Sequence, residues 1–168
     1  MRRQPGLPAE LSSLVGRDLE IAAVREGLRA GRVVTLTGPG GCGKTRLALR
    51  AAALASDGFA DGAWLVELAS LTDAALVPVS VAEALGVPER DAAHPLEAVV
   101  RALADRELLI VLDNCEHVLG PAGQVVVMLA GQSRNIIVAS VDRVARLHGR
   151  MPWPCYADIV DSSARRES

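Results

Sequence analysis

The sequence predicts an α/β fold in which a parallel sheet carries helices on both faces. Half of the 168 residues are apolar but only 2% are aromatic, so the core must be built from Val, Leu, Ile and Ala. Strand-like and helix-like stretches alternate along the chain. A glycine-rich segment joins the first strand to the next helix, at the strand end where such sheets bind ligands.

Four strands are expected from short runs of aliphatic and β-branched residues. The first and third runs are almost wholly apolar, which is typical of strands covered on both faces. The expected strands are residues 33 to 37, 63 to 68, 108 to 112 and 136 to 140.

Five helices are expected from apolar residues spaced three and four apart and from their end signals. Asp18 begins the first, Asp57-Gly58 stops the second, and Pro95 suits the first position of the fourth. Pro78 lies inside the third and predicts either a kink or a later start. The expected helices are residues 18 to 31, 43 to 56, 72 to 85, 95 to 104 and 122 to 130.

The segment after the first strand satisfies the Walker A pattern G-x-x-x-x-G-K-[ST]. Its glycines let successive backbone N–H groups turn around a phosphate, and the following helix directs its positive end at the same anion. Lys44 can reach the β- and γ-phosphates, and the Thr45 hydroxyl suits Mg²⁺. The predicted nucleotide-binding residues here are Gly38, Pro39, Gly40, Gly41, Cys42, Gly43, Lys44, Thr45 and Arg46.

A magnesium nucleotide site also needs a carboxylate across from the glycine loop. Asp113 ends the aliphatic third strand, and with Thr45 it is the predicted metal ligand. Position 114 is Asn, so Glu116 is the nearest candidate base for the attacking water, or else a solvated acid of the next helix. The predicted catalytic residues are therefore Lys44, Asp113 and Glu116.

Composition limits the other functions. Eighteen basic and 20 acidic side chains give a net charge of −2, so we expect no direct binding of nucleic acid and no membrane association. The three cysteines are widely spaced, which indicates a reducing, cytoplasmic location rather than a disulfide framework. Cys42 is interpreted as packing rather than a redox switch, and Cys115 with His117 supplies too few ligands for a metal site.

Taken together, three strings of residues resemble the nucleotide-binding (NB-ARC-like) domain of bacterial STAND-class P-loop ATPases, found in actinobacterial antibiotic-regulatory and LuxR-type transcriptional regulators. The resemblance covers about residues 7 to 140. The strings are Leu14-Val15-Gly16-Arg17, Leu36 to Ala48 including the glycine loop, and Leu112-Asp113-Asn114-Cys115-Glu116-His117.

This resemblance implies an ATP- and ADP-binding switch in signal transduction, reset by slow hydrolysis. It places Val15, Gly16 and Arg17 against the adenine and ribose, and Asp113 at Mg²⁺. The implied partners are the nucleotide and other regulator domains. A remnant without activity and a small-molecule P-loop kinase are the alternative functions, and as an enzyme the chain is at most a slow ATPase.

The chain departs from the family after the fourth strand. Asp142 stands where the family carries an arginine that senses the γ-phosphate, and Arg143 fits only with a one-residue shift. The expected organisation is an arm (1–13), a nucleotide-binding domain (14–140) truncated after four strands, and an irregular tail (141–168). The family's strand order of fifth, first, fourth, third, second would then leave residues 33 to 37 at an open edge, unless Tyr156 to Val160 pairs there. Because Pro152 and Pro154 precede that segment, we expect self-association through the edge instead.

Overall fold

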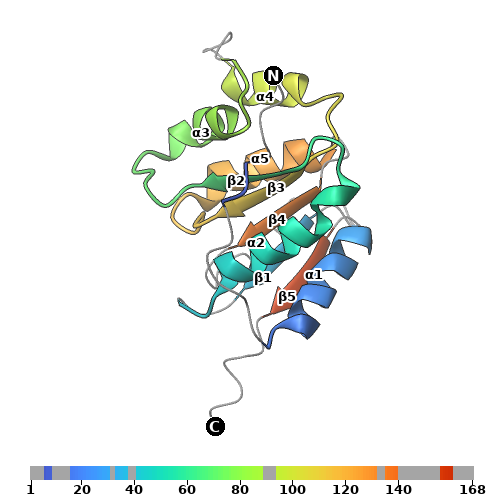
Figure 1. Ribbon diagram of the computed structural model, residues 1–168. Helices are drawn as coiled ribbons and strands as arrows, with labels where there is room; N and C mark the ends of the chain where they lie inside the picture. The colour runs from blue at the N-terminus through green and yellow to red at the C-terminus, as the bar shows by residue number, and fades with distance from the viewer. Residues whose placement is uncertain are drawn as a thin grey trace.

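The computed structural model describes residues 6–8, 16–30, 33–37, 41–88, 94–131, 135–139 and 156–160. Helices and strands alternate along the chain, as the sequence predicts (Figure 1). The helices are α1 (Asp18–Ala30), α2 (Lys44–Ala55), α3 (Val77–Ala84), α4 (Pro95–Ala102) and α5 (Leu119–Gly131). The strands are β1 (Val33–Thr37), β2 (Ala63–Glu67), β3 (Leu109–Asp113), β4 (Asn135–Ala139) and β5 (Tyr156–Val160), and η1 (Ser56–Gly58) and η2 (Ala74–Leu76) are short 3₁₀ turns.

All five strands form one parallel sheet in the order β2-β3-β4-β1-β5. Because every pairing is parallel, all carboxyl ends lie along one edge of the sheet. β1 lies beside β4 although 97 residues lie between Thr37 and Asn135, and the glycine loop therefore leaves the sheet near its middle. The expected α/β fold and strand order are confirmed.

The expectation of four strands and an open edge at β1 is wrong. β5 pairs with β1 along its whole length, from Val33 opposite Tyr156 to Thr37 opposite Val160. Pro152 and Pro154 made a strand at residues 156–160 an unexpected feature of the sequence. Those prolines precede the strand and remove no N–H group from the five paired positions. The expected irregular tail therefore contains a strand at residues 156–160.

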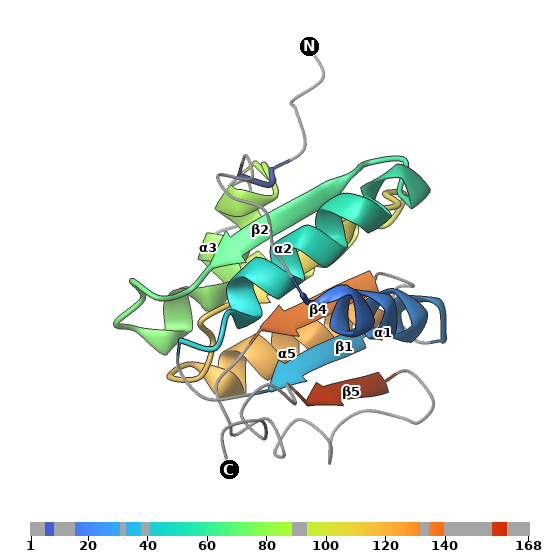
Figure 2. The same ribbon diagram turned by 60° about the horizontal axis from the view of Figure 1, so that its bottom comes forward.

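The helices cover both faces of the sheet (Figures 1 and 2). Side chains of β3 alternate: Leu109 and Val111 pack with α1 and α2, whereas Ile110 and Leu112 pack on the opposite face with α3, α4 and α5. Both sets are fully buried, which explains the continuous apolar run that the sequence shows there. The sheet that carries the glycine loop and Asp113 is thus packed between two layers of apolar side chains, one on each face.

Two prolines lie where helices tolerate them. Asp73 accepts a hydrogen bond from the Ala75 N–H and caps η2, and α3 begins at Val77 with Pro78 in its first turn. Of the two outcomes expected at Pro78, the later helix start is the correct one. α5 begins at Leu119, earlier than predicted, because Pro121 also fits a first turn that requires no N–H group.

The N-terminal segment 6–8 lies against the outer edge of β2. The Leu65 N–H donates to the Gly6 carbonyl at 3.2 Å, and Leu7 packs against the core beneath α2. A Cβ on Gly6 would lie 2.8 Å from Cε3 of Trp64, so the close approach requires glycine. This main-chain contact therefore covers part of the outer edge of β2.

Candidate functional site

The described part of the glycine loop runs directly into α2. Gly41 has φ 79° and Gly43 has φ 88°, both in the left-handed region that glycine enters without steric cost. Gly43 is the N-cap of α2, and its carbonyl accepts the first helical hydrogen bond, from Leu47 N–H at 2.9 Å. The amino end of α2, with its positive dipole end, therefore adjoins the glycine loop, as phosphate binding requires.

Lys44 extends from the first position of α2 and is only 8% exposed. Its Nζ lies 3.6 Å from the Sγ of Cys42, so the ammonium group lies back over the glycine loop. Lysine is rarely this buried in proteins unless its charge is compensated. Its position suits a point charge that acts on an anion held by the loop.

Thr45 and Asp113 meet although 68 residues separate them in the sequence. The Thr45 hydroxyl lies 2.9 Å from Oδ1 and 2.8 Å from Oδ2 of Asp113, so it donates to either carboxylate oxygen. Thr45 is on the first turn of α2 and Asp113 is the last residue of β3, two strands from β1 in the sheet. The fold brings together the two hard oxygen groups that the sequence predicts as metal ligands.

Asp113 is 2% exposed, and this burial raises the pKa of its carboxyl above the usual 3.8. Hydrogen bonds from Thr45 and from the Asn114 backbone act in the opposite direction, while the negative charges of Glu67 and Glu116 raise the pKa further. Glu67 ends β2 directly opposite Asp113 in the strand register. A cation beside Asp113 would therefore relieve both the burial and the repulsion.

Asn114 follows Asp113 with φ 53°, and it is the one residue other than glycine with positive φ in the described chain. Asparagine adopts this left-handed conformation more readily than most residues, and its Nδ2 also lies 3.3 Å from Oδ2 of Asp113. The turn directs the chain away from the sheet immediately after the carboxylate.

Glu116 is half-buried, and its Oε2 is a buried atom that makes no hydrogen bond to any described residue. Since it lies close enough to Asp113 to raise that residue's pKa, it remains the candidate base near the predicted metal. His117 lies 2.9 Å from the Leu71 carbonyl oxygen, and Cys115 is buried in the core. No group of three potential metal-binding His, Cys, Asp or Glu side chains occurs within the described ranges.

Arg17 makes a contact that the sequence analysis did not anticipate. Its Nη2 donates to the Cys42 carbonyl oxygen at 2.6 Å, which joins the start of α1 to the glycine loop. Gly16, the preceding residue, is exposed with φ 77°. Nothing in the spacing of residues 17 and 42 indicates that they meet.

The donor set fits Mg²⁺, which prefers carboxylate and hydroxyl oxygens together with phosphate oxygens. Thr45 and Asp113 would hold the ion, and its charge would neutralise the phosphates there. Of the other predicted nucleotide-binding residues, Arg46 is exposed on α2. Val15, Gly38, Pro39 and Gly40 lie outside the described residues, as do Asp142 and Arg143. Sequence reasoning missed Glu67, although it ends β2 as Asp113 ends β3.

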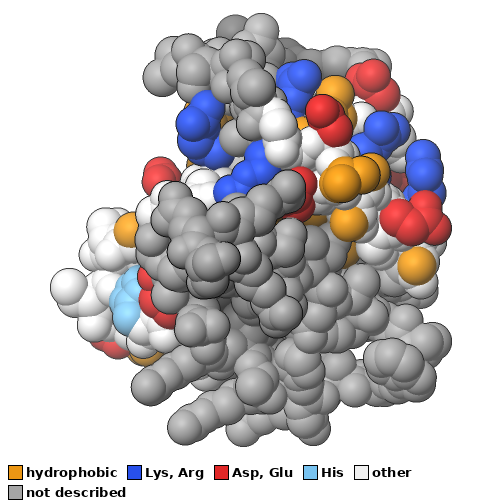
Figure 3. Space-filling view, turned by 90° about the horizontal axis from the view of Figure 1, so that it is seen from below, with side chains coloured by type: hydrophobic (Ala, Val, Ile, Leu, Met, Phe, Trp, Pro, Cys, Tyr) orange, Lys and Arg blue, Asp and Glu red, His pale blue; other side chains and the backbone are white. Residues whose placement is uncertain are grey.

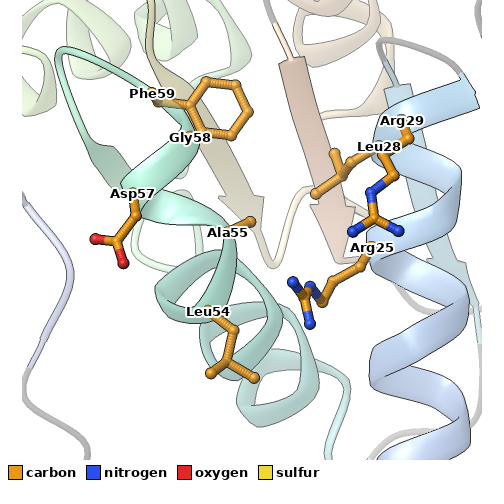
Figure 4. Close-up of a pocket in the computed structure, with 8 residues that line it drawn as sticks. All are labelled: Arg25, Leu28, Arg29, Leu54, Ala55, Asp57, Gly58 and Phe59. Carbon is orange, nitrogen blue, oxygen red and sulfur yellow. The ribbon is translucent and has the colours of Figure 1, made fainter.

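A cavity of about 450 Å³ lies elsewhere, between the carboxyl-terminal halves of α1 and α2 (Figure 4). Arg25, Leu28 and Arg29 form one wall, and the other is formed by Leu54, Ala55, Asp57, Gly58 and Phe59. At 1.5 Å per residue, Leu54 lies about 15 Å along α2 from Lys44, so this cavity is separate from the glycine loop. Viewed from below, acidic and basic side chains are interspersed over the described surface (Figure 3).

Comparison with known proteins gives the family. Residues 28–139, which include the glycine loop and Asp113, match the family model described as an AAA domain. The chain belongs to the AAA domain family. It is therefore a P-loop NTPase domain, a class of domain that binds nucleotide, typically with Mg²⁺. None of the described helices is both long and apolar enough to cross a bilayer.

Similar sequences occur in longer mycobacterial proteins. This chain is 37% identical over 144 residues to "Uncharacterized protein Rv0894" of Mycobacterium tuberculosis, an alignment that covers 85% of this chain and 37% of that protein. It is 36% identical over 127 residues to "Putative HTH-type transcriptional regulator Rv0890c" of the same species, which covers 75% of this chain and 14% of that protein. The chain thus spans well under half the length of these relatives.

Solved structures share the fold at low sequence identity. The STAND protein with a tetratricopeptide repeat sensor, PH0952 from Pyrococcus horikoshii, has a TM-score of 0.59 at 15% identity, over 94% of this chain and 24% of that chain. Cdc6p from Pyrobaculum aerophilum has a TM-score of 0.57 at 16% identity, over 90% and 46% respectively. These likenesses support the fold of the AAA domain.

Proposed function

We propose that this AAA domain is the nucleotide-binding switch module of a STAND-type regulator, which binds Mg-ATP and Mg-ADP and hydrolyses ATP slowly or not at all. The observation that carries the proposal is the contact between Thr45 and Asp113. It brings a hydroxyl on the helix after the glycine loop to a carboxylate at the end of another strand, the pairing that a bridging Mg²⁺ requires.

Each residue has a role that follows from its chemistry. The loop from Gly38 to Gly43 and the amino end of α2 would bind the phosphates through backbone N–H groups. Lys44 would neutralise the β- and γ-phosphates, and Thr45 and Asp113 would hold Mg²⁺. Glu116 would act as the base toward water, since its Oε2 makes no hydrogen bond to any described residue.

The regulator part of the proposal rests on similarity. The sequence strings at residues 14–17, 36–48 and 112–117 resemble STAND regulators, and one relative is named as an HTH-type transcriptional regulator. The fold is shared with a protein described as a STAND ATPase with a repeat sensor. Its partners would be other domains of such a regulator, with the nucleotide as the signal that selects between two arrangements.

Thermal unfolding with and without Mg-ADP tests nucleotide binding, because a ligand that binds only the folded state raises its stability. At 100 times the Kd the gain is about 2.7 kcal/mol. Lys44→Ala should remove this gain, and Thr45→Ala should remove mainly the part that needs Mg²⁺. Arg29→Ala is the matched control, since Arg29 is an exposed basic residue at the far end of α1. An equal gain in the Lys44→Ala protein would refute the assignment.

Lys44 also permits a direct measurement, because it is the only lysine in the sequence. Lysine modification by an amine-directed reagent, followed by mass spectrometry, therefore reports on one side chain, and Met1 supplies the only other amine. Bound Mg-ADP should slow modification of Lys44 and leave the rate at Met1 unchanged. Equal rates at Lys44 with and without saturating nucleotide would contradict contact with phosphate.

A further inference from the structure

We infer that Arg17 is a positioning residue for phosphate binding, which orients the backbone N–H of Gly43 by holding the carbonyl of Cys42. This inference rests on the proposed nucleotide-binding function and adds a part to the same site. The resemblance to STAND ATPases implies a different place for Arg17, beside the adenine and ribose.

The contact between Arg17 and the loop is short and shielded. Nη2 of Arg17 donates to the Cys42 carbonyl oxygen at 2.6 Å, and the Arg17 side chain is 17% exposed. The other side of the guanidinium faces Glu20, whose Oε1 lies 4.0 Å from Nη1 of Arg17. The Glu20 side chain is 10% exposed. A charged donor with little access to water makes a stronger hydrogen bond than a neutral one.

Peptide geometry transmits this contact to the phosphate side of the loop. In a planar trans peptide the C=O and the following N–H point in opposite directions. A guanidinium that holds the Cys42 carbonyl toward α1 therefore turns the Gly43 N–H away from α1. Gly43 is the N-cap of α2, so this N–H lies at the amino end of the helix, where an anion would bind.

The loop needs such an anchor because its own backbone is permissive. Gly41 and Gly43, on either side of Cys42, both have left-handed φ values, and glycine changes φ at little steric cost. If the peptide between Cys42 and Gly43 rotated, a carbonyl oxygen would replace the N–H and repel a phosphate. The 4.0 Å between Arg17 Nη2 and a Cβ placed on Gly43 shows that the guanidinium lies close to this peptide.

The two possible roles of Arg17 predict different ligand dependence. A contact with adenine would affect ADP but not GDP to the same extent, and it would not affect inorganic pyrophosphate. An oriented Gly43 N–H would affect all three ligands by the same factor, because they share the phosphate groups. Displacement of a fluorescent ADP analogue measures the three affinities in one assay.

For Arg17→Ala we expect affinity for ADP, GDP and pyrophosphate to fall together by about 10- to 100-fold, with the ADP to GDP ratio unchanged. Arg17→Lys, which keeps a charged donor, should recover part of the loss, and Arg29→Ala should match the wild type. A loss confined to ADP, or unchanged pyrophosphate affinity, would overturn the inference. If Arg17→Ala does not fold, the affinities of Arg17→Lys and wild type for the same three ligands are compared instead, with the same criteria.

A second readout examines the peptide itself in the ligand-free protein. The ¹⁵N–¹H resonance of Gly43 should shift or broaden in Arg17→Ala, while that of Gly58, in the η1 turn that follows α2, stays in place. An unchanged Gly43 resonance would overturn the inference. If the wild type binds none of the three ligands, the proposed function itself fails, and this outcome is distinct from equal binding by wild type and variant.

Discussion

Replacing Asp113 with asparagine should stabilise the ligand-free protein while weakening its response to Mg²⁺. The carboxylate is 2% exposed, its pKa is raised chiefly by burial, and Glu67 and Glu116 add negative charge nearby. Asparagine removes the charge, keeps almost the same shape, and still offers an oxygen to the Thr45 hydroxyl. The native carboxylate is thus costly until a cation is bound, a conflict common at functional sites.

The sign of the pH dependence follows from the raised pKa. From about pH 3.8 up to the raised value, the folded protein holds a proton that the unfolded chain has released, so stability falls as the pH rises. Above the raised pKa the carboxyl of Asp113 is ionised in the folded protein, and the full cost of burying this charge lowers the stability. Relief of a buried, repelled carboxylate is worth about 1 to 2 kcal/mol, or about 2 to 8 °C in Tm for a chain of this size.

Thermal unfolding of Asp113→Asn and wild type from pH 7 down toward the usual carboxyl pKa of 3.8, without nucleotide, measures this effect. The variant should unfold at the higher temperature at pH 7, and its advantage should shrink as the pH falls. Asp57→Asn, an exposed acid at the opposite end of α2, should leave Tm almost unchanged. A lower Tm for Asp113→Asn at pH 7 would show that the hydrogen bonds to the carboxylate outweigh its burial, which would refute the reasoning. With ADP present, added Mg²⁺ should raise Tm in the wild type more than in the variant.

Three further outcomes are expected. ATP turnover by the purified chain should lie far below the roughly 10 s⁻¹ typical of enzymes. By the resemblance to STAND regulators, Asp142 stands at the position of a γ-phosphate arginine, and such an arginine can contribute about 10³ to 10⁵ in rate. Phosphate release near 10 s⁻¹ would contradict this expectation. A chain shortened to residues 1 to 155 should elute from size-exclusion chromatography as a dimer or larger species, because β1 loses its partner β5 and becomes an open edge of the sheet. A monomer in which Val33 to Thr37 are still protected from hydrogen exchange would show that this edge of β1 needs no partner. Gly43→Ala should lower Tm by about 2 to 8 °C, since alanine at φ 88° costs about 1 to 2 kcal/mol. Gly58 has an ordinary φ and open space for a Cβ, so Gly58→Ala should change Tm little. Similar Tm shifts for both variants would argue against strain at Gly43.

Much of the fold was predictable because its signals are local. The β-branched run at β1, the glycines after it, and the apolar spacing of α2 place strand, loop and helix in the correct order. Lys44 and Thr45 follow from the same pattern, since the phosphate-binding loop is one continuous segment. Asp113 was identifiable because an aliphatic strand that ends in an acid is also a local signal.

Contacts between distant segments were decided only by the tertiary structure. β5 forms because parallel pairing with β1 satisfies backbone groups that would otherwise remain open, although its own sequence is a weak strand signal. The pairing of Glu67 with Asp113 and the contact of Arg17 with Cys42 depend on strand register and on where α1 begins relative to the loop. The sequence by itself predicted most of the elements and the candidate phosphate-binding residues. The tertiary structure determined which side chains surround that chemistry, because local spacing carries no information about which strands become neighbours.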